Sequence, residues 1–294
     1  MPAIDIDSIR AAMGGIGATG VQVEAVAETG STNRVLMDAP FGADTAPPRL
    51  LAAARQTAGR GRQGRGWIME PGRSAAFSVA VERLATGGGP AVGLSIAAGV
   101  AVAGALAALL REVARHGAAG AAAASPDAGI GLKWPNDLQR AGRKAGGILV
   151  ESRRSPGAAA QIERYVVGIG LNLIAPRDDR GAIGQPAIGV FDGETLPLPL
   201  ERIVGQVAAA VVDAAGLFFC EGLAPFADDW HRFDALRGRQ VVAFAEGRTE
   251  AAGVARGIDA DGALLLDTAG GVKAVRSGEV SVRALAEPQP PAES

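Results

Sequence analysis

The sequence is poor in the residues that many enzymes use for metal binding or nucleophilic catalysis. Among 294 residues it has one cysteine, Cys220, and two histidines, His116 and His231. A single cysteine cannot form an internal disulfide, which is typical of a reducing compartment, and we expect a cytoplasmic protein. The cysteine and the histidines do not cluster as zinc ligands do. Neither histidine has neighbours that suggest a Ser-His-Asp triad.

Aromatic residues and net charge are also scarce. Phe, Trp and Tyr make up 4% of the chain, so Ala, Val, Leu and Ile must supply most of its 48% apolar content. The formal net charge is −2 at pH 7, whereas general nucleic-acid binders usually present a basic face. No G-x-x-x-x-G-K-[ST] pattern occurs, which argues against a phosphate-loop NTPase.

Targeting and membrane signals are weak. Residues 1–7 have neither a basic region nor a long apolar run, so we expect no secretory signal. Residues 91–110 carry no charge and could span a bilayer by length. They are mostly Ala and Gly, which contribute little to insertion. We therefore predict a buried helix and no membrane partner.

Positive charge is concentrated in one short segment. Residues 56–67 read QTAGRGRQGRGW and contain three Arg, four Gly and no acid. Glycine lets a backbone approach a ligand closely, and arginine offers a charged fork of donors to carboxylate or phosphate. Similar compositions occur in disordered tails that touch nucleic acid. Because apolar strands are expected on both sides, at 50–54 and 77–82, we predict an anion-binding loop on a folded scaffold.

Polar residues also stand at an expected turn and in an expected hairpin. Residues 31–33, Ser-Thr-Asn, lie where a strand at 21–26 turns into a helix, so they are either a helix cap or a ligand site. Residues 132–151 resemble a hairpin that turns at 141–142. This pairing would place Asp137 near Gly146 and diagonal to Lys144. The pair is either a surface ion pair or an ammonium with its orienting carboxylate.

The clearest strand, residues 165–173, has one face without side chains. Successive residues of a strand alternate faces, so Gly168, Gly170 and Asn172 share a face and the apolar residues share the other. Glycine on a strand face marks the close approach of a ligand or another backbone. We favour a ligand here.

The remaining pattern predicts helices and a small second domain. Helices are expected at 91–115, 200–219 and 223–234, and residues 1–20 are taken as a lead-in. Short alternating runs at 240–245, 253–258, 263–267, 272–276 and 280–283 predict a small antiparallel barrel. We expect a catalytic domain over 1–235, the small domain over 236–286, and a disordered tail over 287–294.

Taken in order, these motifs resemble the bacterial biotin–protein ligases over roughly residues 25–285. The resemblance implies an α+β fold, with a mixed sheet and flanking helices like those of lipoate ligases and class II aminoacyl-tRNA synthetases, and a C-terminal SH3-like barrel. It implies that biotin and Mg-ATP give biotinoyl-AMP, and that a lysine of a biotin carboxyl carrier domain then receives the biotin. Only about 20–25 residues precede the first strand, so we expect the monofunctional type, without a DNA-binding domain or a DNA partner. We expect a monomer or weak homodimer.

The resemblance also implies roles for individual residues. Catalytic roles fall to Lys144, Arg62 and Asp137. Biotin would be bound by Ser31, Thr32, Asn33, Gln56, Arg60, Arg62, Lys144, Gly147, Gly168 and Gly170. The nucleotide would be bound by Arg60, Arg62, Arg65, Trp67, Lys133, Asn136 and Asn172, with Mg²⁺ held through the ATP phosphates and not by protein ligands.

Two alternatives stay open at this stage. A lipoate or octanoate ligase would share the fold, although residues 56–67, here named the Arg/Gly loop, and the C-terminal barrel favour biotin. A nucleotide-regulated or RNA-binding module without catalysis is the rival from another class. Residues 73–77 are poorer in aromatics than is usual in the family, which leaves the shape of the biotin pocket open.

Overall fold

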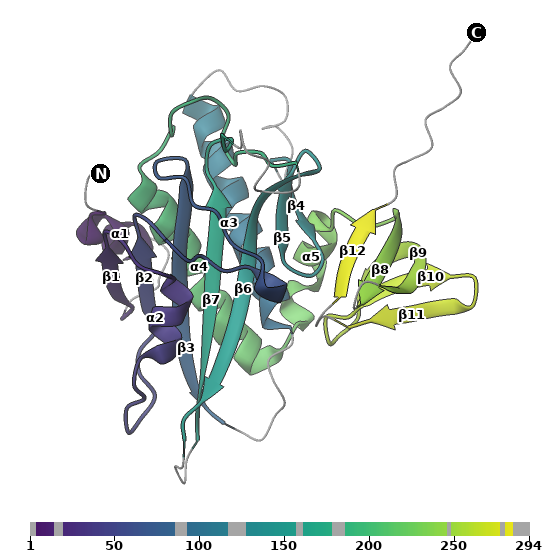
Figure 1. The fold of residues 1–294 in the computed structure, drawn as a ribbon, viewed down its shortest axis with the longest axis horizontal. Coiled ribbons are helices and arrows are strands. Elements are labelled where there is room, and N and C mark those ends of the chain that lie inside the picture. The colour runs from purple at the N-terminus through teal and green to yellow at the C-terminus, as the bar shows by residue number, and fades with distance from the viewer. Residues whose placement is uncertain are drawn as a thin grey trace.

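The computed structural model describes residues 4–14, 20–85, 93–116, 128–156, 161–177, 186–245, 248–276 and 280–284. A seven-stranded sheet forms its centre, in the order β1-β2-β3-β7-β6-β5-β4 (Figure 1). Its strands are β1 (Gln22–Val26), β2 (Arg49–Ala53), β3 (Ser74–Leu84), β4 (Ile130–Lys133), β5 (Asp137–Arg140), β6 (Arg143–Arg154) and β7 (Ile162–Asn172). The β1–β2 pair is parallel and the other pairs are antiparallel. The predicted mixed sheet is confirmed.

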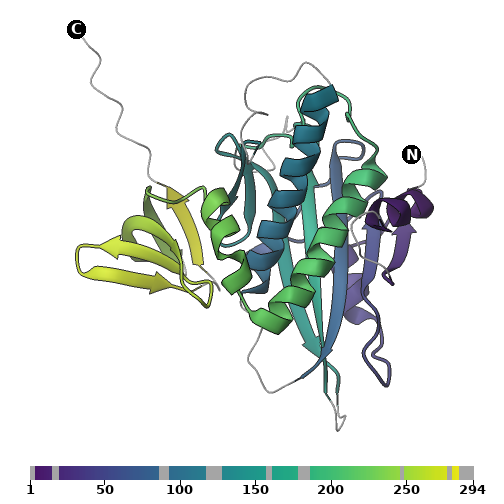
Figure 2. The ribbon, with the colours of Figure 1, turned by 180° about the vertical axis from the view of Figure 1, so that it is seen from behind.

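Two long helices cover one face of this sheet (Figure 2). They are α3 (Leu94–His116) and α4 (Leu200–Glu221). Both are long and apolar enough to cross a membrane, but 67% and 50% of their most apolar windows are buried inside the protein. The core supplies their apolar surroundings, so the prediction of a buried helix at 91–110 is confirmed.

The lead-in expected at residues 1–20 contains a helix. Helix α1 (Ile6–Gly14) buries Ile9 and Met13, which are four residues apart and therefore lie on one face. That face packs on α4 at Gly205, where an added Cβ would lie 2.7 Å from the carbonyl oxygen of Ile9. A short apolar helix of this kind is stabilised by its packing more than by its own sequence.

The opposite face of the sheet carries helix α2 (Thr32–Asp38) and the Arg/Gly loop (Figure 1). Alternation along β3 explains the two faces, because Phe77 and Val79 enter the main core under α3 and α4. Ala80 points the other way, into a smaller cluster with Leu36 of α2. This second face is only partly covered and is the one that bears the polar motifs.

A five-stranded antiparallel sheet follows, in the order β11-β10-β9-β8-β12. Its strands are β8 (Gln240–Ala245), β9 (Arg248–Ile258), β10 (Leu264–Thr268), β11 (Gly271–Val275) and β12 (Val280–Ala284). All five predicted strands are present, in the SH3-like domain that the sequence predicted. A short turn, η3 (Ala224–Phe226), and helix α5 (Ala227–Phe233) connect it to α4. The tail predicted at 287–294 lies outside the described residues.

The two sheets are joined by a buried tryptophan. Trp134, in the turn between β4 and β5, is 1% exposed, and its Nε1 donates to the carbonyl oxygen of Gly262 at 2.9 Å. An indole N–H taken out of water needs such a partner. The hairpin that carries the Lys133 and Asn136 motif is therefore fixed directly to the C-terminal domain.

Candidate active site

One cavity of about 820 Å³ opens on the partly covered face of the large sheet. All the residues predicted to bind biotin or nucleotide, or to act in catalysis, line it. They are Ser31, Thr32, Asn33, Gln56, Arg60, Arg62, Arg65, Trp67, Lys133, Asn136, Asp137, Lys144, Gly147, Gly168, Gly170 and Asn172. The structure thus brings together residues as far apart in sequence as Ser31 and Asn172, while the role of each stays a prediction.

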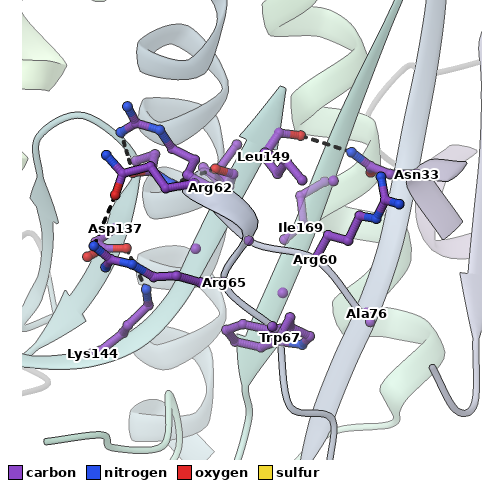
Figure 3. Close-up of a pocket in the computed structure, with 18 of the residues that line it drawn as sticks. Asn33, Arg60, Arg62, Arg65, Trp67, Ala76, Asp137, Lys144, Leu149 and Ile169 are labelled. Carbon is purple, nitrogen blue, oxygen red and sulfur yellow. Dashed lines mark hydrogen bonds and ion pairs between the residues drawn. The ribbon is translucent and has the colours of Figure 1, made fainter. Parts of the chain in front are cut away.

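The Arg/Gly loop is a folded hairpin that crosses in front of the sheet (Figure 3). The amide of Gly61 donates to the carbonyl of Arg65 at 2.7 Å, and that of Trp67 donates to Gly59 at 2.9 Å, around the short turn η1 (Arg62–Gly64). Gln63 adopts a positive φ of 57°, which few residues other than glycine favour. A side chain at Gly59 would lie 2.6 Å from the carbonyl of Trp67, so the hairpin can close only over glycine.

A chain of hydrogen bonds between hydroxyls and amides forms the end of the cavity below α2. The Oε1 atom of Gln56 accepts from the amide of Thr32 at 2.7 Å. The hydroxyls of Thr32 and Ser78 are 2.6 Å apart, and Ser78 donates to Oδ1 of Asn33 at 2.6 Å. Asn33 in turn donates to Glu151 at 2.8 Å. Because Thr32, Ser78 and Asn33 are buried, this chain holds their groups in fixed orientations.

Ser31 plays the structural part that its position suggested and also lines the cavity. It is the N-cap of α2, and its hydroxyl accepts from the amide of Arg34 at 3.5 Å. The helix-cap interpretation is therefore confirmed. It does not exclude a contact with a ligand, since Ser31 also contributes to the cavity wall.

The hairpin of β5 and β6 holds a lysine and a carboxylate in contact. The Nζ atom of Lys144 lies 2.6 Å from Oδ1 of Asp137, and both side chains are about four-fifths buried. Asp137 pairs with Gly147 and its neighbour Leu138 pairs with Gly146, so Asp137 lies near Gly146 as predicted, but a bulge shifts the register between Leu138 and Gln139. An extra residue on one strand of a pair cannot be read from turn position alone.

Cations dominate the other end of the cavity. Arg62, Arg65, Lys133, Lys144 and Arg283 lie there, whereas Arg60 lines the cavity on the side of Asn33 (Figure 3). Asp137 is the one carboxylate among the described lining residues. Burial lowers the pKa of Lys133, and the nearby Asp137 opposes that shift. Burial likewise lowers the pKa of the Arg62 guanidinium, whose Nη1 donates to Oδ1 of Asn136 at 3.1 Å. Such a cluster of positive charges is suited to bind an anion, whose negative charge would favour the charged forms of the lysines and arginines.

Comparison with known proteins accounts for both sheets. Residues 26–172 match the model of the biotin/lipoate A/B protein ligase family, and residues 238–283 match the biotin protein ligase C-terminal domain. The biotin–[acetyl-CoA-carboxylase] ligase of Mycobacterium tuberculosis is 32% identical over 95% of this chain and 96% of its own length. The corresponding ligase of Paracoccus denitrificans is 33% identical over 87% and 98%. The chain belongs to the biotin protein ligase family.

Other relatives agree with this placement. The bifunctional ligase/repressor BirA of Escherichia coli is 34% identical over 86% of this chain and 71% of its own length. The biotin protein ligase of Aquifex aeolicus, solved in complex with biotin and ATP, superposes with a TM-score of 0.68 at 24% identity, over 90% and 99% of the two chains. The ligases of Mycobacterium tuberculosis and Paracoccus denitrificans identify this biotin protein ligase as an enzyme. The likeness to the Aquifex aeolicus structure confirms its fold.

The two glycines predicted to face a ligand, Gly168 and Gly170, lie directly against other side chains of the ligase. An ideal Cβ on Gly168 would overlap Oδ1 of Asn33, and one on Gly170 would lie 2.5 Å from the indole of Trp67. Both glycines still line the cavity. The close approach that required glycine is therefore that of Asn33 and Trp67, and a ligand would lie beside these side chains.

Sequence reasoning missed several lining residues of this biotin protein ligase. Ala76 and Ser78 of β3 stand opposite Gly170 and Gly168 and complete the small-residue floor. Strict alternation along β3 would have identified them. Arg283 and its neighbours in β12 also line the cavity, but no signal in a short alternating strand shows that it faces a site in another domain.

The floor also contains an unpaired donor. The Nε1 atom of Trp67 is buried and has no hydrogen-bond partner. An orphan donor of this kind costs free energy. It would be relieved by an acceptor on a bound ligand.

Proposed function

We propose that this ligase activates biotin with ATP in the described cavity and transfers it to a lysine of a biotin carboxyl carrier domain. The supporting observation is that two kinds of chemistry meet in one cavity. Hydroxyls and amides form a neutral end, and arginines and lysines form a cationic end. A volume of about 820 Å³ lies within the range of small-molecule sites.

The neutral end is matched to a cyclic urea. A ureido ring offers one carbonyl acceptor and two N–H donors, and the fixed groups of Thr32, Ser78 and Gln56 can provide the complementary donor and acceptors. A dithiolane ring or an alkyl end has no such groups and would gain no hydrogen bonds at this end of the cavity. This difference favours biotin over lipoate or octanoate.

The cationic end is matched to two anions that must react with each other. A biotin carboxylate oxygen would attack the α-phosphorus of ATP, breaking its bond to pyrophosphate and leaving an acyl–adenylate. Lys144, held by Asp137, and Arg62 would lower the repulsion between the carboxylate and the phosphate and stabilise charge on the phosphoryl oxygens. A carrier-lysine amine would then attack the acyl carbon, lose a proton, and release AMP.

No covalent enzyme group takes part in this scheme. Among the described residues, no three or more His, Cys, Asp or Glu converge as a metal site. Asp137 is already paired with Lys144. Mg²⁺ would enter on the triphosphate, where it neutralises charge, and the residues of the chain would bind and orient around it.

The partner and setting of the reaction rest on the relatives. Two of them are named for acetyl-CoA-carboxylase, so a carrier domain of a biotin-dependent carboxylase is the proposed acceptor. A boundary between the two domains near residue 235, a cytoplasmic location, a monomeric or weakly dimeric state and the lack of a DNA partner stay predictions.

Pyrophosphate exchange into ATP tests the proposal. The full chain, with Mg²⁺, would be given biotin, lipoate or octanoate. Exchange with biotin alone is the expected result. Exchange with lipoate or octanoate alone would show that the substrate is that acid and not biotin. No exchange with any of the three acids by folded protein would reject adenylation at this cavity.

A further inference from the structure

The backbone of Lys144 is held by a segment outside the regular sheet. The amide of Lys144 donates to the carbonyl of Pro186 at 3.1 Å, and the amide of Ile188 donates to the carbonyl of Lys144 at 2.9 Å. Pairing between β6 and β7 begins only at Gly146. Residues 186–194, here named the crossing segment, therefore supply backbone partners that β7 does not give to Lys144, and Nδ2 of Asn172 adds a side-chain bond to the Lys144 carbonyl at 3.4 Å.

The crossing segment also fixes the end of β7 and has little room to move. Its Val190 donates to the carbonyl of Asn172 at 2.7 Å, and the Val190 side chain is fully buried. A Cβ on Gly189 would lie 2.6 Å from the amide nitrogen of Ala175. Such close contacts hold the crossing segment in one position relative to two cavity residues, Lys144 and Asn172.

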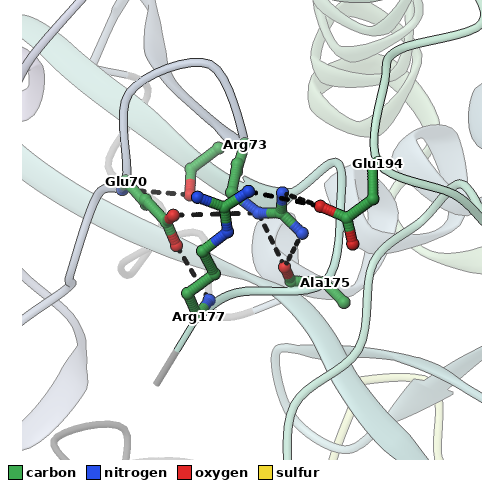
Figure 4. A network of polar contacts seen from close by, with 6 residues as sticks. Glu70, Arg73, Ala175, Arg177 and Glu194 are labelled. Carbon is green, nitrogen blue, oxygen red and sulfur yellow. Dashed lines mark hydrogen bonds and ion pairs between the residues drawn. The ribbon is translucent and has the colours of Figure 1, made fainter. Parts of the chain in front are cut away.

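Two arginines bind the far end of the crossing segment. Asp192 accepts from both Nη atoms of Arg140, at 2.7 and 2.6 Å. Glu194 accepts from Nη1 of Arg73 at 2.7 Å, and Arg73 also donates twice to the carbonyl of Ala175, at 2.9 and 2.6 Å (Figure 4). The bond to Arg140 lowers the pKa of Asp192, and the bond to Arg73, followed by that to Arg177, lowers the pKa of Glu194.

The two arginines belong to different parts of the large sheet. Arg140 ends β5, three residues after Asp137. Arg73 precedes β3, six residues after Trp67, and its carbonyl accepts from the amides that follow β7. The crossing segment is thus joined to the lysine hairpin at one end and to the exit of the Arg/Gly loop at the other.

We propose that the crossing segment positions Lys144 for adenylation, with Asp192 and Glu194 as the positioning residues that hold it. The inference rests on the proposed function of Lys144. Both carboxylates are mostly exposed, at 82% and 73% of their side-chain surface. The side chains of Arg140 and Arg73, in contrast, are only 12% and 9% exposed. Each acid therefore ties the crossing segment to a buried arginine of a neighbouring element.

The test combines kinetics with amide hydrogen exchange on Asp192→Asn, Glu194→Gln and the double variant. We expect the double variant to lose about tenfold in the kcat of biotin-dependent pyrophosphate exchange, because small displacements of a catalytic group are costly. The KM for biotin should change less than about twofold, since the neutral end of the cavity is not touched. The amides of Lys144 and Ile188 should lose protection from exchange, which reports local opening.

A charge swap separates positioning from simple loss of a surface acid. Asp192→Arg alone should behave as the neutral variant does, and adding Arg140→Asp should restore both kcat and protection at Lys144. Gly189→Ala provides a second route without a change in charge, because its methyl group must displace the segment. It should lower kcat at least as much as the double variant.

Asp267→Asn is the matched control. Asp267 also accepts from two nitrogens of one arginine, Arg256, but lies in the C-terminal sheet. If the double variant keeps the kcat of this control, or loses protection at Lys144 with no change in kcat, the inference is wrong. If the unsubstituted protein shows no pyrophosphate exchange, the result counts against the proposed function. Amide hydrogen exchange at Lys144 would still show whether the crossing segment holds this residue.

Discussion

Asn33 occupies the space that a side chain at residue 168 would need. An ideal Cβ on Gly168 overlaps Oδ1 of Asn33, and that same oxygen accepts a hydrogen bond from Ser78. The glycine on β7 and the polar chain under α2 are therefore one unit. Any side chain at 168 must move Asn33 and, with it, the hydroxyls of Ser78 and Thr32.

Gly168→Ala should weaken biotin binding. The new methyl group displaces Asn33 and disorders the neutral end of the cavity, while the cationic end is left in place. We expect the KM for biotin to rise about tenfold or more, which corresponds to a loss of at least about 1.4 kcal/mol of binding free energy. The KM for ATP should change less. Gly104→Ala on α3 is the control, because a methyl group there meets nothing within 4 Å. Equal KM values for biotin in the two variants would contradict this account of the pocket.

Lys144→Ala should stop adenylation without preventing biotin binding. The substitution removes the cation placed against Asp137 and leaves the Thr32, Ser78 and Gln56 groups untouched. We expect pyrophosphate exchange to fall by a factor of about 100 or more, with biotin affinity by calorimetry within a few-fold. Lys273→Ala, on the exposed surface of the small sheet, controls for loss of a lysine. Near-normal exchange in the Lys144 variant would remove this residue from the chemistry.

Nucleotide binding should weaken at alkaline pH because of Lys133. Burial lowers the pKa of Lys133, so its ammonium loses its charge at a lower pH than an ordinary lysine does. The KM for ATP should therefore rise as pH increases toward the ordinary lysine pKa of about 10.4. Lys133→Arg keeps its charge over this range and should give a flatter profile. The same rise in both proteins would assign the effect to another group.

The ion pair of Glu82 and Arg164 should be important for stability. Both side chains are 4% exposed, Nη2 and Oε1 are 2.6 Å apart, and Arg164 also donates to carbonyls at the end of α2. Glu82→Gln leaves a buried guanidinium without its counter-charge, at a cost of about 3 kcal/mol. Urea denaturation should show that loss, against less than about 1 kcal/mol for Glu28→Gln in an exposed pair with Arg55. Similar midpoints for the two variants would contradict this prediction.

Local patterns predicted much of this molecule. Alternation identified the β7 face of Gly168 and Gly170 and the five strands of the small sheet. Charge and glycine content identified the Arg/Gly loop as part of a site. These features depend on residues that are close in sequence, where the geometry of a strand or turn fixes which side chains share a face.

What the sequence did not predict depends on contacts over long distances. Arg140 and Asp192 are 52 residues apart, and nothing near either one indicates the other. The bulge after Leu138 and the use of Gly168 as space for Asn33 both follow from packing between elements. Helix α1 was missed because its stability comes from contact with α4, not from a strong helical signal of its own.

The wall contributed by β12 sets an order of events during synthesis. Residues 280–283 line the same cavity as Ser31, so about 250 residues must be added after the first polar motif before the site is complete. A nascent chain that has already folded its large sheet would still lack the wall that β12 contributes. If the cavity forms an adenylate as proposed, the β12 side of its enclosure would be complete only after the last strand of the small sheet has left the ribosome.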